Sequence, residues 1–203
     1  MPSELRPGLQ YSGTEHVSGL VDRLRLGWLL KHFPPLLVRT LYVFVNGFIT
    51  IALLSLLAVL TGTAFVFPSL GPTAYLFFFS PLAESASPKN AILGHAIGLA
   101  CGYGAFRFAV EYGPVKFHDR IDWPTILAAA LSLALTGAFM VLLRISHPPA
   151  GATTLIVSLG ILSTLRDLVI IEAAVALLTV QAFVINRLAG LPYPIWNHKF
   201  PVP

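Results

Sequence analysis

Apolar residues form long uncharged runs in this chain, and short proline-rich polar segments separate them. The first run, Leu41–Gly62, has 22 residues without a charge, which is enough for a helix to cross the ~30 Å hydrocarbon core of a bilayer. Three further apolar runs of similar length cover Ala91–Val110, Pro124–Leu143 and Leu168–Leu188. The pattern predicts an all-α membrane protein with four transmembrane helices.

Two shorter apolar stretches lie between these runs, at 65–79 and 150–162. Each is too brief to cross a bilayer as a helix, and prolines interrupt the backbone where each begins. Irregular backbone at membrane depth is tolerated where protein covers it or where it lines a water-filled path. We therefore expect two re-entrant half-helices that enter the membrane and turn back.

The beginnings of the two short stretches are similar in sequence. Residues 67–74 (FPSLGPTA) align without gaps on residues 147–154 (HPPAGATT), 80 positions later. Both contain a P-x-x-G-x-T element, in which the identical pairs are Pro68/Pro148, Gly71/Gly151 and Thr73/Thr153. This indicates two internal repeats, 41–112 and 121–190, each with the order span, half-helix, span.

The repeats are expected to be parallel, related by an axis near the membrane normal. If both half-helices start and finish on one side, the termini and the 111–122 loop share the other side, together with ten of the 13 Lys and Arg residues. This excess of positive charge indicates that the side with the termini is cytoplasmic. In the alternative, each half-helix crosses completely, which gives six spans and places the 111–122 loop outside.

The flanking segments differ from the transmembrane domain, which we assign to residues 41–190. Residues 1–40 hold a tail and the segment Glu15–Phe33, whose apolar residues recur at helical spacing. This spacing predicts an amphipathic helix that lies in the membrane interface or packs on the rest of the protein. Residues 191–203 are expected to form a C-terminal tail that returns to the surface.

Composition supports the membrane assignment. The chain is 56% hydrophobic and only 11% charged, whereas soluble domains carry roughly 25% charged residues. The net charge of +4 comes from basic residues at the ends of apolar runs, so we expect a lipid bilayer as partner and no nucleic acid. The single cysteine, Cys101, has no disulfide partner and forms no metal-binding spacing, and we expect no metal and no cofactor.

The repeated breaks offer the donors that a small-anion site requires. Two helices that begin at equivalent depth direct positive dipole ends and N–H groups toward the middle, and hydroxyl groups donate without adding charge. The candidate substrate-binding residues are Ser69, Gly71, Thr73, Ser146, His147, Gly151, Thr153 and Thr154, and the turns are shaped by Pro68, Pro72, Pro148 and Pro149. Alternatively, the P-x-x-G-x-T element only makes the turn.

Three ionisable residues at membrane depth are further candidates, because ionisable groups in that environment are costly and usually functional. His147, whose counterpart in the first repeat is Phe67, could donate to an anion or cap backbone groups. His95 and Glu172 lie in the second and fourth spans. The repeat offset of 80 residues makes Glu172 equivalent to position 92 of the first repeat, which is about one helical turn from His95. The two residues could therefore form a proton relay or an ion pair.

Glycines at four-residue spacing, Gly94, Gly98 and Gly102, give the second span a face without side chains. Such a face allows a neighbouring helix to approach closely, either within one subunit or between two subunits. Because a domain of four spans is slender, we also expect a homo-oligomer.

The tripeptide His147-Pro148-Pro149, the AGATT that follows it and the upstream segment 67–74 resemble the HPP family of integral membrane proteins. The segment SPKN at 87–90 adds to the similarity, which covers about residues 35–190. The resemblance implies a four-span domain, and plastid and cyanobacterial relatives are associated with nitrite transport.

Membrane transport of a small inorganic anion, with nitrite as the leading candidate, is therefore the expected function. The alternative is a membrane anchoring or assembly subunit without transport activity. An enzyme is not expected, because no catalytic triad, phosphate loop or second metal ligand accompanies the intramembrane histidines. We expect a multi-pass protein of a prokaryotic cell (inner) membrane with cytoplasmic termini.

Overall fold

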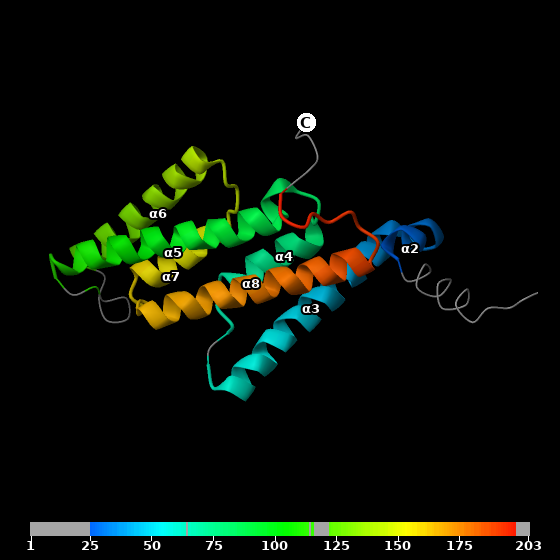
Figure 1. The fold of residues 1–203 in the computed structure, drawn as a ribbon, viewed down its shortest axis with the longest axis horizontal. Helices are drawn as coiled ribbons and strands as arrows, with labels where there is room; N and C mark the ends of the chain where they lie inside the picture. Colours follow the sequence, from blue (N-terminus) through cyan, green and yellow to red (C-terminus); the bar gives the residue numbers. More distant parts are fainter. Residues whose placement is uncertain (1–24, 64, 114, 116–121, 198–203) are drawn as a thin grey trace, which may run out of the picture.

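The computed structural model describes residues 25–63, 65–113, 115 and 122–197, and this part of the chain is all-helical, without a strand. It contains seven α-helices and one short 3₁₀ helix (Figure 1). Their bounds are α2 Leu26–His32, α3 Pro35–Thr61, α4 Leu70–Phe79, η1 Glu84–Ala86, α5 Pro88–Val110, α6 Trp123–Leu143, α7 Ala150–Ser158 and α8 Leu165–Leu188.

Three helices of the described residues are long and apolar enough to cross a membrane, namely α3, α6 and α8. They correspond to three of the four spans predicted from the sequence. α3 is longer than predicted, because Pro35 occupies its first turn, where a missing N–H costs nothing, and Gly62 ends it in the left-handed conformation.

The fourth predicted span forms α5, which has 23 residues but is less apolar than the other three. The reason lies in its position, because α5 packs against α6, α7 and α8. Its buried residues include several glycines and His95. A helix that faces protein on most sides needs small residues for close packing more than it needs lipid solubility.

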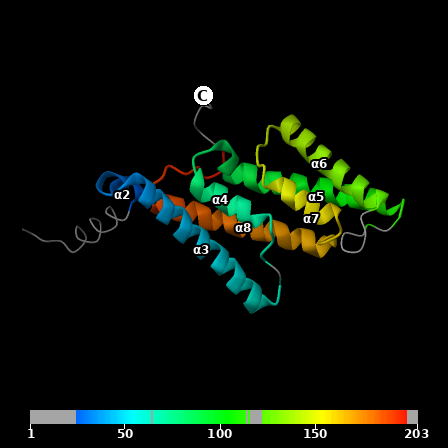
Figure 2. The same ribbon diagram turned by 180° about the vertical axis from the view of Figure 1, so that it is seen from behind.

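Two groups of three helices make up the bundle. α5 packs with α6 and α7, α8 packs with α3 and α4, and α5 and α8 contact each other between the two groups. Figures 1 and 2 show α5 and α8 near the centre, with α6 on one flank and α3 on the opposite flank. Each group therefore takes two helices from one half of the sequence and its third helix from the other half.

Hydrogen bonds show which helix ends lie together. Tyr42, near the start of α3, donates to Asn186 near the end of α8 (2.7 Å), and Asn186 donates to the carbonyl of Phe77 near the end of α4 (3.1 Å). The N–H of Lys89, at the start of α5, donates to the carbonyl of Trp196 (3.1 Å). One end of the bundle therefore holds the starts of α3 and α5 and the ends of α4 and α8.

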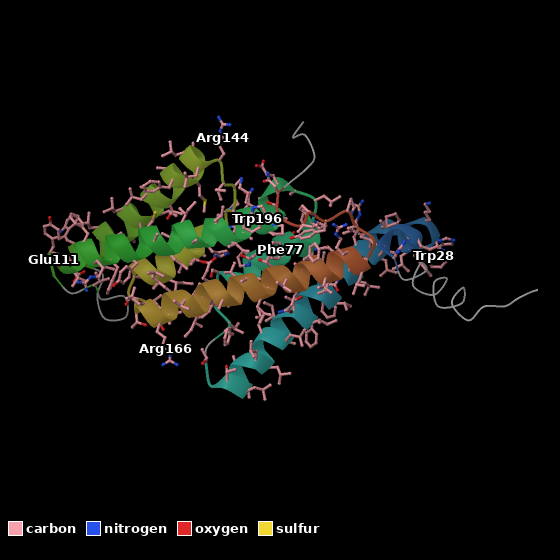
Figure 3. The ribbon with its side chains drawn as sticks, in the orientation of Figure 1. Trp28, Phe77, Glu111, Arg144, Arg166 and Trp196 are labelled. Atoms are coloured by element: carbon pink, nitrogen blue, oxygen red, sulfur yellow. The ribbon has the colours of Figure 1, made fainter. Side chains whose placement is uncertain are left out.

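The direction of α5 differs from the predicted topology, which placed the start of α3 and the end of α5 on one side. Figure 3 shows Glu111, directly after α5, and Trp28, directly before α3, at opposite ends of the molecule. After α3 the chain turns back toward the middle of the bundle before α4 begins, and α4 continues to the end where α3 started (Figure 1). The predicted re-entrant half-helices and parallel repeats are therefore not confirmed by the directions of these helices.

The glycine face of α5 packs within the subunit. A Cβ atom added at Gly98 would lie 2.8 Å from the carbonyl oxygen of Ala150, and one at Gly102 would lie 2.7 Å from that of Thr154. At Gly94 the neighbour is the side chain of His147, at 2.6 Å. The glycines thus let α7 and the segment before it approach the α5 backbone, and this face is not available to a second subunit.

The N-terminal helix is described only in part, since residues 15–24 of the predicted amphipathic segment lie outside the described residues. The remainder, α2, ends before Pro34, and the N–H of Leu26 donates to the carbonyl of Ala189 (2.9 Å). This end of α2 therefore packs on the end of α8, and its position relative to a membrane interface stays a prediction.

Substituting Gly98 by alanine should destabilise the protein. The added methyl group would overlap the backbone of α7, and overpacking of this kind costs about 1–3 kcal/mol. Gly104→Ala is the matched control, because nothing lies within 4 Å of its Cβ position. Thermal unfolding of the purified protein in detergent should show a lower Tm for Gly98→Ala than for Gly104→Ala, and equal values would contradict the packing described.

Candidate functional site

The two P-x-x-G-x-T elements meet at the side chain of His95. The Nδ1 atom of His95 lies 2.7 Å from the hydroxyl of Thr153 in α7, and its Nε2 atom lies 3.0 Å from the hydroxyl of Thr73 in α4. All three side chains are fully buried. The identical threonines of the repeated element therefore bind opposite sides of one imidazole ring from α5.

His147 extends this contact toward the surface. Its Nε2 atom lies 3.3 Å from the hydroxyl of Thr73, and its Nδ1 atom lies 2.8 Å from the carbonyl oxygen of Ser85 in η1. The rings of His95 and His147 have centroids 4.9 Å apart. Hydrogen bonds thus connect five segments of the fold: α7, α5, α4, η1 and the turn before α7.

The acceptors assign the tautomers of both histidines. The carbonyl of Ser85 can only accept, so Nδ1 of His147 carries the hydrogen and Nε2 of the neutral ring can only accept. The single hydrogen of the Thr73 hydroxyl is donated to the carbonyl of Ser69 at 3.0 Å, and Nε2 of His147 is a second acceptor for it at 3.3 Å. Thr73 then has no second hydrogen, so Nε2–H of His95 donates to it, and Nδ1 of His95 accepts from Thr153. These contacts link Thr153, His95, Thr73, His147 and the carbonyl of Ser85 in one continuous series of hydrogen-bonding groups, which we call the histidine–threonine chain.

Local sequence explains why the threonines reach this position. Pro148 and Pro149 stop any helix from continuing, and α7 begins directly after them. Leu70 opens α4 in the same way, with its N–H bonded to the carbonyl of Phe67 (2.9 Å). In both elements the threonine lies one turn into the new helix, where its hydroxyl points back past the break.

The backbone donors at the start of α7 are already occupied. The N–H groups of Ala150, Gly151 and Ala152 donate to the carbonyls of residues 147, 148 and 149, at 3.0–3.1 Å. The expected free N–H groups are therefore absent at this helix start in the described conformation. The donors that the structure brings together are side chains.

The predicted substrate-binding residues divide into two groups. Thr73, His147 and Thr153 belong to the histidine–threonine chain, and Ser69 is buried beside it, where its backbone carbonyl lies 3.0 Å from the hydroxyl of Thr73. The other predicted residues do not join the chain: Gly71 and Ser146 are exposed, Gly151 is half-buried, and Thr154 is buried elsewhere. The binding roles of both groups stay predictions.

Thr154 takes part in a second cluster of hydroxyl groups. It donates to the carbonyl of Gly98 (3.1 Å) and lies 2.8 Å from the hydroxyl of Thr136 in α6. Thr136 was not singled out from the sequence, although a buried threonine in an apolar span is a usable signal. This cluster ties α5, α6 and α7 together next to the site.

Glu172 does not contact His95, as a relay or an ion pair would require. Both ring nitrogens of His95 are occupied by threonines, and the buried carboxylate oxygens of Glu172 have no hydrogen-bond partner among the described residues. The expectation assumed parallel repeats. Because α5 and α8 run in opposite directions, residues at equal distances from the two helix starts lie toward opposite ends of the bundle.

An open groove of about 370 Å³ lies next to His147. Its lining includes Arg144 and Ser146, both exposed, and Glu84 from the neighbouring turn. Arg144 ends α6 in the left-handed conformation (φ 54°), and Figure 3 shows it on the outside of the bundle. The groove leads from the surface to His147, which closes it with a fully buried side chain.

The segment after α8 covers the turn that His147 binds. The hydroxyl of Tyr193 donates to the carbonyl of Ala86 (2.5 Å), and its ring lies edge-on to Phe77, with centroids 6.5 Å apart. Burial raises the pKa of Tyr193, which keeps the phenol protonated as a donor. The sequence suggested a tail that returns to the surface, but Tyr193 is fully buried.

Removing the Thr73 hydroxyl should destabilise the protein, because both histidines would lose a partner inside the bundle. A buried polar group left without its partner costs about 1–3 kcal/mol. Thr73→Val keeps the shape and removes the hydroxyl, whereas Thr73→Ser keeps it. Thermal unfolding should give a clearly lower Tm for the valine variant than for the serine variant, and an exposed Thr61→Val control should match the wild type.

Comparison with known proteins identifies the family. The model for the HPP transmembrane region matches residues 33–194, which is most of the chain. A transmembrane protein of Dictyostelium discoideum is 34% identical over 115 residues, covering 55% of this chain and 34% of that protein. A second one is 29% identical over 133 residues, covering 63% and 44%.

The chain spans less than half the length of these curated relatives. No solved structure matches it. The matched region contains every helix from α3 to α8 and both P-x-x-G-x-T elements. The chain is therefore a membrane protein that belongs to the HPP transmembrane family.

Proposed function

We propose that this chain carries a small inorganic anion across the membrane, with nitrite as the first candidate. The observation that supports it best is the junction of the two repeated elements at His95, inside a bundle of apolar helices. Ionisable side chains within membrane segments are costly and commonly mark the path of a solute. Backbone breaks at this depth are likewise common in the binding sites of transporters.

We further propose that the two halves are inverted repeats that together cross the membrane six times. Each half would cross with its two long helices and, between them, with an extended segment followed by α4 or α7. Because each repeat would cross three times, which is an odd number, the second repeat would enter the membrane from the opposite side and be inverted. The equivalent packing of α4 on α8 and of α7 on α5 supports this arrangement, and inverted repeats place solute sites at their interface.

The charges give an orientation for the six crossings. The bundle end that holds the start of α3 and the end of α8 would face the cytoplasm, because most described basic residues lie toward it. These are Arg25, Lys31, Arg39, Lys89, Arg144 and Arg187, whereas Arg107 and Arg166 lie toward the opposite end. In a prokaryotic inner membrane both described ends of the chain would then be cytoplasmic.

The described conformation would be a closed state of the transporter. The groove beside His147 would admit an anion toward Arg144, whose positive charge raises the local anion concentration. Beyond it, the side chains of the histidine–threonine chain fill the path. The anchoring alternative loses its main support, because the glycine face of α5 is used within the subunit.

His147→Ala should lower nitrite uptake by roughly tenfold, since a lost hydrogen bond to a charged solute is worth about 1.5–3 kcal/mol. Uptake is measured in liposomes that contain the purified protein, with nitrate, formate and chloride as competitors. His32→Ala is the matched control, because His32 is exposed on α2. If wild-type liposomes take up no anion faster than protein-free ones, the transport proposal is wrong.

Cysteine labelling tests the six crossings. In a Cys101→Ala background, Glu84→Cys and Tyr112→Cys place one exposed thiol at each end of the bundle. With an impermeant reagent on right-side-out vesicles, only Tyr112→Cys should react, and on inverted vesicles only Glu84→Cys. Four crossings would give the reverse pattern.

A further inference from the structure

We infer that the solute crosses together with one proton, and that His95 passes this proton between Thr153 and Thr73. The transported anions would then be conjugate bases of weak acids, such as nitrite and formate. This inference rests on the proposed transport function and adds to it a substrate class and a role for the histidine–threonine chain.

The charges at the junction support a proton as partner of the anion. Threonine hydroxyls from α4 and α7 and the ring of His147 contact His95. Among the described residues, the only other titratable group that α8 presents along its buried length is Glu172, whose carboxylate has no hydrogen-bond partner. The junction therefore has no fixed cation, since Arg144 lies outside it on the groove.

A bare anion at such a junction would be unfavourable. Removing an unpaired charge from water costs far more than a few neutral hydrogen bonds return. A proton that crosses with the anion and is held by His95 at the junction cancels the anion's charge, so that the pair is neutral overall. Anions of strong acids, such as nitrate and chloride, do not hold a proton and would not be neutralised in this way.

The histidine–threonine chain has the connectivity that proton transfer requires. The weak acid gives its proton to the oxygen of Thr153 while the hydroxyl hydrogen of Thr153 moves to Nδ1 of His95. The hydrogen on Nε2 of His95 then moves to the oxygen of Thr73. The hydroxyl of Thr73 turns its own hydrogen from the carbonyl of Ser69 to Nε2 of His147 and transfers it there, so that one N–H or O–H bond forms for each one that breaks. His147 becomes an imidazolium at the inner end of the groove, and it releases one proton to water when its side chain moves toward the groove and leaves the closed state.

The transfer reverses the direction of every hydrogen bond between Thr153 and His147. His95 now donates to Thr153, Thr73 donates to His95, and His147 donates to Thr73. Because Thr153 and Thr73 belong to α7 and α4, the tautomer of His95 determines the direction of its bonds to both broken helices. Proton position and helix contacts are therefore coupled.

The test measures initial nitrite uptake and internal pH together, in liposomes that contain the full chain. Nitrous acid also crosses lipid directly, so the rate in protein-free liposomes is subtracted. The wild-type rate should rise in proportion to the external proton concentration, with one proton entering per nitrite. Formate should compete and nitrate should not. His95→Gln should lose the dependence on external pH, while His32→Gln should behave as wild type.

Thr153 provides a pair of variants that does not depend on replacing the histidine. Thr153→Ser retains the hydroxyl and should keep the coupling, whereas Thr153→Val removes it and should lose the coupling. A cooperative thermal unfolding transition above the assay temperature in each variant shows that both are folded. If Thr153→Val remains coupled like the wild type, the inference is overturned.

The uptake experiment distinguishes a failure of proton coupling from a failure of the transport proposal. Wild-type nitrite uptake that ignores external pH, or that brings in no proton, overturns the inference and leaves the transport proposal intact. Equal competition by nitrate would likewise overturn the inference and leave the transport proposal intact. Absence of protein-dependent uptake of any of the anions overturns the transport proposal and the inference together.

Discussion

The fold depends on how two broken helices satisfy their polar groups inside an apolar bundle. At that depth water does not compensate a free hydroxyl or ring nitrogen, so each one needs a partner from the protein. His95 meets this need for Thr73 and Thr153 at once, because an imidazole carries one donor and one acceptor on opposite sides. The position of α4 relative to α7 is thereby fixed through a single side chain of α5.

The second constraint is the space that this contact requires. The turn before α7 comes so close to α5 that a side chain at Gly94 would collide with His147. Glycine lowers the helix propensity of α5 and its apolarity, yet α5 is the helix that most of the bundle covers. The glycine spacing and the threonine–histidine contacts are therefore two parts of the same packing solution.

Sequence patterns predicted the helices better than their directions. The uncharged runs located α3, α6 and α8, and the repeated P-x-x-G-x-T element located the starts of α4 and α7. Direction was missed because a ten-residue apolar helix is compatible both with turning back and with finishing a crossing begun by an extended segment. Hydropathy gives no signal for the direction of the chain around such a short helix, and the assumption of parallel repeats then misplaced Glu172 relative to His95.

In the candidate site, too, the sequence indicated which residues take part but not how they contact one another. Thr73, Thr153, His147 and His95 were identified from residue type and spacing, but their mutual bonds depend on tertiary packing. The partner of His147 is the backbone carbonyl of Ser85, which no side-chain pattern could indicate. Tyr193 was likewise hidden in a tail with several prolines, where burial cannot be inferred from local composition.

The two halves of the fold are similar, but their chemistry is not. The residue that corresponds to His147 in the first half is Phe67, which is also buried but cannot exchange a proton. The hydrogen-bond chain therefore continues from His95 past Thr73 to the groove, whereas the side of Thr153 has no second imidazole. In the proposed mechanism, the two broken helices surround a path for protons that begins at Thr153 and ends at the groove.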